Sequence, residues 1–540
     1  MNPVGDLRLN LGGYSGTVDR RLEIWQQEGF GERLRSRDPT LWFEEDVPEL
    51  TNRLGWISLP GQSTNQIDEI LSFVEDVRSD AFSKIVLMGM GGSSLAPQVF
   101  QKTFGNAEGF PELITIDTPH PGAVRGVEAM IGGEKTLFVL ASKSGRTLEP
   151  LSIFRYFWER AGEDKRDPGQ RFVAITDPGT PLESMAKEKG FRRTFFAAPD
   201  LGGRYSALTA YGLVPAALIG IDVRRLLIHA RMEAEAMNGL LLGAAMGELA
   251  LAGRDKVTFL TSPSVSEFPV WLEQLIAEST GKDGRGILPV VGEPIIDADL
   301  YGADRFFVLL TLGGDDGLEN RLTMIEKAGH PTARIKLRDI YGLGMEIFRW
   351  EVGVASAGSI LGIHPFNQPD VELSKKRARE VMEGSYPASL ELKTTITDDV
   401  VGLRDELEAF IALANDGDYF SIQAFLQPDP NTDRSLEMIR ETLLSRTGLA
   451  TTLGYGPQFL HSTGQLHKGG PNTGLFLQIV DHAKEDLPIP GTGQTFDQVI
   501  SAQSIGDYIA LGQRGRRVVR IDLDGDVEGG LRRVSAALDY

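Results

Sequence analysis

The sequence predicts an α/β fold of two or three doubly wound units with parallel sheets, preceded by a helical N-terminal arm. Two observations carry this prediction. Apolar segments of strand length alternate with longer segments of helical periodicity over most of the chain beyond residue 60. A chain of 540 residues is also too long for one hydrophobic core, so several domains are expected.

The arm is predicted over residues 1–60. Leu22, Trp25, Leu34 and Leu50 have the spacing of apolar residues on helical faces. We therefore expect helices ahead of the first domain.

The first domain is predicted over residues 61–235, where strands and helices alternate. Its expected strands are 85–88, 113–116, 136–140 and 171–176, and its expected helices are 65–77, 96–103, 122–130 and 149–161. Because such alternation produces a parallel sheet covered by helices on both faces, we expect a ligand at the carboxyl ends of the strands.

Two further α/β regions are predicted at 236–376 and 418–540. The first has strands 256–260, 305–312 and 333–337 and a long apolar helix at 342–361. The second has strands 419–426, 474–480 and 517–522 and helices 435–446 and 497–511. The charged, irregular residues 377–417 between them are predicted to be a connection or an insertion.

The composition excludes several classes of function. The chain has no cysteine, so disulfides, thiolate nucleophiles and cysteine-bound metals are ruled out. Its seven histidines form no His-Glu-x-x-His or His-x-His pattern, so no metal site is expected. The net charge of −20 disfavours binding to nucleic acid, and an anionic substrate would need a local basic pocket.

The chain also lacks membrane and export signals. No apolar run approaches the ~20 residues that cross a membrane. The first 13 residues include Asp6 and Arg8 and lack the apolar centre of a signal peptide. We therefore expect a cytoplasmic protein that does not enter a membrane.

A glycine-rich loop at Gly89–Ser94 follows strand 85–88 and precedes a helix. Glycines let the backbone approach a ligand, and a helix start offers free N–H groups to an anion. The alternative is a tight strand–helix connection without a ligand.

A second loop repeats this arrangement after strand 136–140. Ser142, Ser144 and Thr147 surround a glycine, and Lys143 adds a positive charge. Isolated hydroxyls cap helices, but this cluster suits a phosphate better. Together the two loops predict a phosphorylated small molecule as the ligand.

Four later positions carry candidate catalytic groups. Arg204 follows paired glycines, which would bring its permanent charge close to a ligand. Glu278 ends an apolar helix, where a partly desolvated carboxylate can act as a base. Lys375 follows a proline-rich loop, and His461 lies in a glycine-rich segment. The alternatives are a salt-bridging arginine, an exposed helix-end glutamate, a solvated lysine and a solvated polar loop.

Five segments, in this order along the chain, resemble the signatures of the glucose-6-phosphate isomerase family, which is built from sugar-isomerase (SIS) domains. They are Gly89–Ser93, Ser142–Pro150, Gly202–Ser206, Glu278–Lys282 and Pro365–Glu372. The resemblance extends over about residues 56–376. The segment Leu460–Gly470 is similar to the isomerase half of bifunctional transaldolase/glucose-6-phosphate isomerases. The resemblance implies two or three SIS-type units.

The resemblance also implies roles for individual residues. Gly92 and Ser93 would contact the sugar. The phosphate would be bound by Ser142, Lys143, Ser144 and Thr147. Glu278 would move a proton between C1 and C2, and Arg204 would stabilise the cis-enediolate. Lys375 and a histidine would assist opening of the hexose ring, and no metal or cofactor is implied.

The chain departs from the family at the histidine. Bacterial members have it shortly after the glutamate, in an Asp-Leu-His-Ser-x-Gly-Gln segment, but the matching stretch here contains Tyr301. The Leu-His-Ser-x-Gly-Gln pattern occurs instead at Leu460–Gln465, after the lysine segment. We therefore expect His461 to take the role from the C-terminal region. In many members the histidine comes from the neighbouring subunit, so the resemblance also implies a homodimer.

Other functions compete with this interpretation. The enzyme could also accept mannose 6-phosphate, which the shape of its pocket decides. A sugar-phosphate-sensing SIS protein would keep the phosphate loops without catalysis, but such regulators usually carry a DNA-binding helix-turn-helix, and no basic recognition helix lies near either end. An SIS-domain aminotransferase needs a nucleophilic cysteine, and this chain has no cysteine. No transaldolase half is expected, because no eightfold strand–helix series precedes residue 61.

Overall fold

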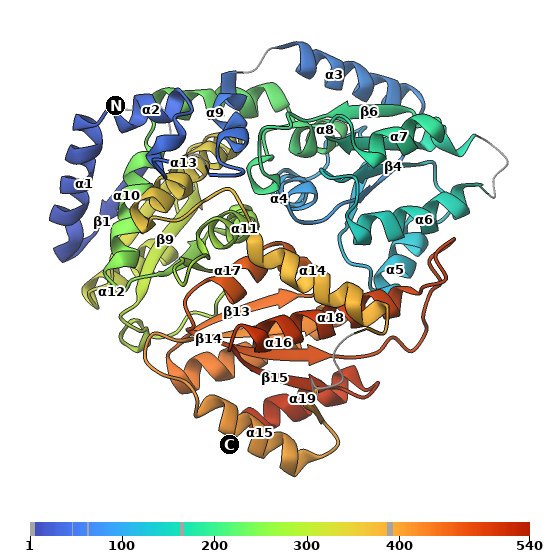
Figure 1. Cartoon of the computed structure of the whole chain (residues 1–540). Helices are drawn as coiled ribbons and strands as arrows, with labels where there is room; N and C mark the ends of the chain where they lie inside the picture. The colour runs from blue at the N-terminus through green and yellow to red at the C-terminus, as the bar shows by residue number, and fades with distance from the viewer. Residues whose placement is uncertain (1–5, 46, 62–63, 163–166, 386–391, 540) are drawn as a thin grey trace.

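Three five-stranded sheets, each built largely from its own stretch of chain, form the molecule (Figure 1). The computed structural model describes residues 6–45, 47–61, 64–162, 167–385 and 392–539. This arrangement confirms the predicted α/β class with several parallel-sheet units. Within those ranges no helix combines the length and the apolar composition needed to cross a membrane.

The first sheet is parallel throughout and has the strand order β3-β2-β4-β5-β6. Its strands are β2 (Lys84–Met88), β3 (Glu112–Ile116), β4 (Thr136–Ala141), β5 (Phe172–Thr176) and β6 (Arg193–Phe196). Its helices are α3 (Thr64–Ser79), α4 (Leu95–Phe104), α5 (Pro121–Ile131), α6 (Leu148–Gly162), α7 (Pro181–Glu188) and α8 (Ala210–Leu218). The strand order reverses at β2, so the carboxyl ends of β2 and β4 flank the crevice where such sheets bind ligands.

The second sheet has the order β1-β10-β9-β7-β8. Its strands are β1 (Asp6–Asn10), β7 (Lys256–Thr261), β8 (Leu288–Val290), β9 (Arg305–Leu312) and β10 (Thr332–Leu337). Its helices are α9 (Val223–Ala236), α10 (Gly239–Leu251), α11 (Phe268–Thr280), α12 (Asp316–Lys327) and α13 (Leu343–Leu361). These elements confirm the strands predicted for the second region.

The N-terminal arm differs from its prediction as a purely helical segment. Helices α1 (Ser15–Gln27) and α2 (Phe30–Arg35) are present, but β1 precedes them and pairs antiparallel with β10. Leu7 and Leu9 are half-buried and alternate with exposed neighbours. That period of two is the signature of a strand with one buried face, so residues 6–10 form a strand and are not part of the helices of the arm.

The third sheet is parallel and has the order β11-β15-β14-β12-β13. Its strands are β11 (Thr394–Ile396), β12 (Tyr419–Phe425), β13 (Ala450–Tyr455), β14 (Gly474–Val480) and β15 (Arg517–Asp522). Its helices are α14 (Pro369–Met382), α15 (Val400–Ile411), α16 (Pro430–Thr447), α17 (Gly464–Gly469), α18 (Phe496–Gln513) and α19 (Val527–Leu538).

The predicted connection at 377–417 belongs largely to this third unit. It contains the end of α14, the edge strand β11 and helix α15; residues 386–391 lie outside the described part. Leu403, Leu407 and Phe410 of α15 are buried in the core beneath the sheet. The many charges of this segment are the outer faces of amphipathic helices, which explains why it resembled an irregular insertion.

Helix α11 lies where the three units meet, beside α17 and α14 (Figure 1). Ala277 of α11 shares one apolar cluster with Leu466 of α17 and Phe476 of β14. A Cβ placed on Gly281, just after α11, would lie only 2.3 Å from the Cα of Leu466. This close packing brings segments almost 200 residues apart in sequence to one point.

Candidate active site

The glycine-rich loop after β2 is packed against two other candidate segments. A Cβ on Gly92 would lie 2.1 Å from the carbonyl oxygen of Gly203, next to Arg204. A Cβ on Gly91, whose φ is +54°, would lie 3.2 Å from the Cβ of His461. No side chain fits at these contacts, so glycine allows the loop to touch both segments. Ser93 beside them is buried.

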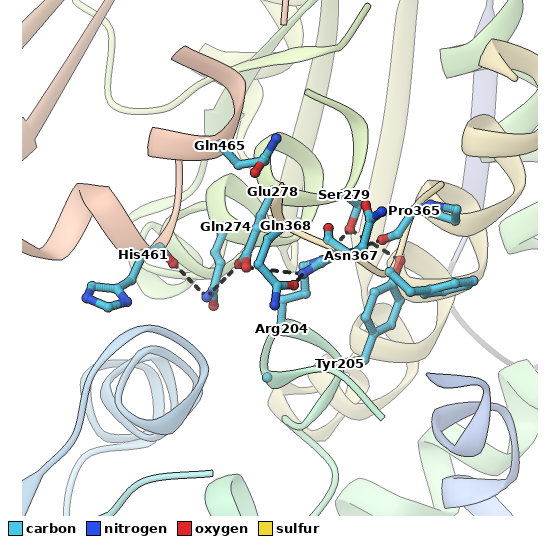
Figure 2. A network of polar contacts seen from close by, with 12 residues as sticks. Arg204, Tyr205, Gln274, Glu278, Ser279, Pro365, Asn367, Gln368, His461 and Gln465 are labelled. Atoms are coloured by element: carbon cyan, nitrogen blue, oxygen red, sulfur yellow. Dashed lines mark hydrogen bonds and ion pairs between the residues drawn. The ribbon is translucent and has the colours of Figure 1, made fainter. Parts of the chain in front are cut away.

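Arg204 is buried, with 1% of the residue exposed, and is held from several sides (Figure 2). Its Nε donates to Ser279 Oγ at 2.8 Å. Its Nη2 donates to the carbonyl oxygens of Pro365 (2.7 Å) and Asn367 (3.1 Å). Its Nη1 donates to Gln368 Oε1 at 3.1 Å. These hydrogen bonds hold the guanidinium group in a single orientation.

Glu278, on the last turn of α11, faces this guanidinium. Its Oε1 lies 3.1 Å from Arg204 Nη1. One turn earlier, Gln274 donates from Nε2 both to Glu278 Oε2 (3.1 Å) and to the carbonyl oxygen of His461 (2.8 Å), as Figure 2 shows. Glu278 is 9% exposed, so it is reachable by a small molecule but largely shielded from water. A carboxylate and a fixed cation thus adjoin in one site.

The His461 imidazole is anchored to the first domain by Glu149. Its Nε2 lies 3.0 Å from Glu149 Oε1, which also accepts from Gln503 Nε2 at 2.5 Å. Burial alone raises the pKa of Glu149, but attraction to His461 and the hydrogen bonds outweigh burial and lower that pKa to about 2. Glu149 is therefore a carboxylate at neutral pH.

Sequence reasoning assigned no role to Glu149. The sequence feature that could have pointed to Glu149 is its position in the first turn of α6, directly after the hydroxyl-rich loop. Gln274, Gln368 and Gln503 were missed as well, because a glutamine carries no chemical signature of its own.

The hydroxyl-rich loop lies between β4 and the N-terminus of α6. The side chains of Ser142 and Thr147 hydrogen-bond each other at 3.0 Å, while Lys143 forms an ion pair with Asp177. Ser144 is exposed and accepts from the backbone N–H of Arg146 at 3.3 Å. Hydroxyls, an ammonium group and a helix start converge here, an arrangement suited to a phosphate.

Two positions considered in the sequence analysis, Lys375 and Tyr301, make no contact with Arg204 or Glu278 among the hydrogen bonds and ion pairs described above. Lys375 is on the exposed side of α14, with 47% of its side chain accessible, and pairs with Glu372 at 2.9 Å. Tyr301 packs against Phe307 and His330, and its hydroxyl accepts from the N–H of Ile296. The structure thus brings His461, and not Tyr301, to Gln274.

Among the residues that the structure describes, no group of three or more histidine, aspartate or glutamate side chains could hold a metal ion.

Comparisons with known proteins find sugar-phosphate isomerases among the relatives of this chain. A family model described as "Phosphoglucose isomerase" matches residues 61–283. A glucose-6-phosphate isomerase of Mycoplasmopsis pulmonis is 30% identical over 391 residues, which cover 61% of this chain and 90% of the relative. One from Rubrobacter xylanophilus is 29% identical over 416 residues, which cover 66% of this chain and 94% of the relative.

Two solved structures share the fold. A hypothetical protein of Thermus thermophilus is 25% identical, with a TM-score of 0.58 over 70% of this chain and 100% of its own. A glucose-6-phosphate isomerase of Chlamydia trachomatis is 19% identical, with a TM-score of 0.53 over 69% of this chain and 81% of its own.

Proposed function

The chain belongs to the glucose-6-phosphate isomerase family, and from that premise we propose which of its residues perform the reaction. The enzyme interconverts glucose 6-phosphate and fructose 6-phosphate. The observation that carries the residue assignment is the 3.1 Å contact between Glu278 and Arg204.

Glu278 is the proposed base. In the direction of fructose 6-phosphate it takes the proton from C2 of the open-chain aldose and returns a proton to C1. The intermediate is a cis-enediolate, whose negative charge develops only along the reaction path. Arg204 is already oriented beside the base and stabilises that charge without rearranging. The buried Oε1 of Gln274 has no partner among the described residues, so it can accept from a sugar hydroxyl.

The substrate's two ends are assigned to the loops after β2 and β4. Gly92 and Ser93 form the wall beside the sugar. The phosphate is bound by Ser142, Lys143, Ser144 and Thr147. The α6 N-terminus behind these four residues adds the positive end of a helix dipole.

Ring opening requires a proton to reach the ring oxygen, and His461 is the proposed donor. The contact between Glu149 and the imidazole Nε2 fixes the orientation of the ring. Lys375 stays a prediction as a second assisting group, since its exposed position on α14 would require the side chain to turn away from Glu372.

His461 and Glu149 come from one chain, so we propose that a single chain builds the whole site. A homodimer and a cytoplasmic location stay predictions. The breadth of substrate, including mannose 6-phosphate, also stays a prediction.

The test is a coupled assay with fructose 6-phosphate on the wild type and Glu278→Gln. Loss of a positioned base costs ~100-fold or more, so kcat should fall by at least that factor. Glu267→Gln, which changes a partly exposed carboxylate just ahead of α11, should leave kcat unchanged. A wild type that binds sugar phosphate without turnover would establish the sensing function instead, and a fully active Glu278→Gln variant would remove the base assignment.

A further inference from the structure

Glu273 is a second acidic residue of α11, besides Glu278. It contacts the short helical turn Gln458–His461 and the following Ser462, which together are called the His461 turn below. Ser462 Oγ lies 3.4 Å from Glu273 Oε1 and equally 3.4 Å from the carbonyl oxygen of Phe459, so its one proton is shared between a carboxyl group of α11 and the backbone of the turn. The next residue of the helix, Gln274, donates to the carbonyl oxygen of His461 at 2.8 Å. Two consecutive residues of one helix therefore hold two consecutive residues of the turn. A change at Glu273 acts on the backbone that carries the His461 imidazole.

Solvent and protons can reach Glu273 through a cavity. A cavity of about 380 Å³ opens between α4, α11, α16 and the β13 end, with Glu273, Gln458 and Ser462 in its lining. Glu273 also borders a gap, too narrow for a water molecule, together with Thr452 and His467. Thr452 Oγ1 and His467 Nε2 are buried there and have no hydrogen-bond partner among the described residues. Glu273 therefore lies between the cavity and these buried polar atoms.

The surroundings of Glu273 let it change charge near neutral pH. Burial raises the pKa of Glu273 to about 7, against the opposing attraction of Arg440 and the hydrogen bond from Ser462. Burial also lowers the pKa of His467 well below its usual range, so His467 stays neutral in this window. The titratable and charged groups that face Glu273 from the packed elements are Lys102 of α4, Asp433, Glu437 and Arg440 of α16, Tyr455 of β13 and His467 of α17.

We propose that Glu273 is a positioning residue, whose carboxylate accepts the Ser462 hydroxyl and thereby fixes the His461 turn against Glu149. A hydrogen bond to a carboxylate is stronger than one to a neutral carboxyl group. Protonation of Glu273 therefore loosens the turn and slows the step in which His461 acts. The inference rests on the proposed function of His461 and adds a pH response to it.

The test compares the pH profiles of kcat for fructose 6-phosphate between about pH 5.5 and 8.5, a window that brackets the raised carboxyl pKa. Wild-type kcat should rise through an inflection near pH 7. Glu273→Gln keeps an acceptor oxygen for Ser462 but cannot titrate, so its profile should lose the contribution of Glu273 and differ from the wild-type profile near pH 7, while the contribution of His461 remains. Ser462→Ala removes the hydrogen bond, and kcat should fall about tenfold with little change in KM. Glu437→Gln alters another carboxyl of the same cavity and should retain the wild-type profile.

A Glu273→Gln profile that superimposes on the wild-type profile, or a wild-type kcat in Ser462→Ala, would overturn the inference. A second readout does not require activity. In two-dimensional NMR of the full chain labelled with ¹⁵N-serine, the Ser462 amide is the serine signal that disappears in Ser462→Ala, and its shift near pH 7 should be larger in the wild type than in Glu273→Gln. If the wild type turns over no sugar phosphate, the proposed function fails while this titration still decides the link between Glu273 and the turn.

Discussion

Glu278 Oε1 and Arg204 Nη1 lie 3.1 Å apart, although the two residues come from different units of the chain. In the proposed mechanism Glu278 is the base and Arg204 is a permanent cation, so proton removal and stabilisation of the resulting anion would take place at adjacent atoms. The arrangement suits a reaction that creates negative charge next to the carbon that loses a proton.

The shape of the Arg204 guanidinium leads to the first prediction. Arg204→Lys keeps the positive charge but cannot reach Ser279, Gln368 and the carbonyl oxygens of Pro365 and Asn367 at once. We expect kcat to fall by about 10²–10³-fold, the usual effect of losing oriented electrostatic stabilisation of a developing anion. Steady-state kinetics should show a much smaller change in KM. Arg225→Lys, at an exposed position on α9, serves as the control and should behave as wild type.

The Glu149 carboxylate leads to a prediction about both rate and stability. Glu149→Gln weakens the hold on His461, and a charge-assisted hydrogen bond of ~1.5–3 kcal/mol corresponds to a 10–100-fold lower kcat. Because the pKa of Glu149 is lowered to about 2 in the folded protein, its contribution to stability is fully present above the unfolded value near 4.5. It is lost as the pH falls from there toward 2.

Thermal unfolding between about pH 8 and 3 checks this second effect. The variant should melt below the wild type at about pH 5, and the difference should narrow as the pH falls below about 4.5. A difference that widens on acidification would contradict the assignment of Glu149 as a stabilising carboxylate.

Assembly of the site within one chain is tested by complementation. His461→Ala and Glu278→Gln chains carrying different tags are co-expressed, and any mixed oligomer is purified through both tags. If each site uses its own chain's histidine, the mixed species stays inactive. If a partner supplied the histidine, one site of each mixed dimer would contain both intact residues, and activity would return. Recovery of a large fraction of wild-type activity would therefore refute the single-chain site.

Much of the fold was predictable because long apolar strands are visible in the local sequence. β4, β9 and β14 are mostly apolar, and their predicted bounds agree with the structure within a residue or two. The short strands β6, β8 and β11 were missed, as was β13. The first three have only three or four residues, β8 contains a proline, and the tertiary pairing that makes them strands leaves little trace in local sequence.

The site residues likewise fall into those that local sequence predicts and those that depend on tertiary packing. Loops that follow predicted strands could be placed at one sheet edge from the sequence, as Gly92 and Thr147 were. The contact between His461 and Glu149 spans 312 residues and depends on how the third unit packs, which no local pattern encodes. Lys375 was singled out by its motif, yet only the structure reveals that its side chain points to solvent and pairs with Glu372.

The several partners of Arg204 have a further consequence. Water around a free arginine would have to reorient each time a substrate's charge moved from carbon to oxygen. Here the neighbouring oxygens are already fixed by the backbone and by packing. The entropy lost in aligning this cation is therefore lost once, during folding, and the alignment persists through every catalytic cycle.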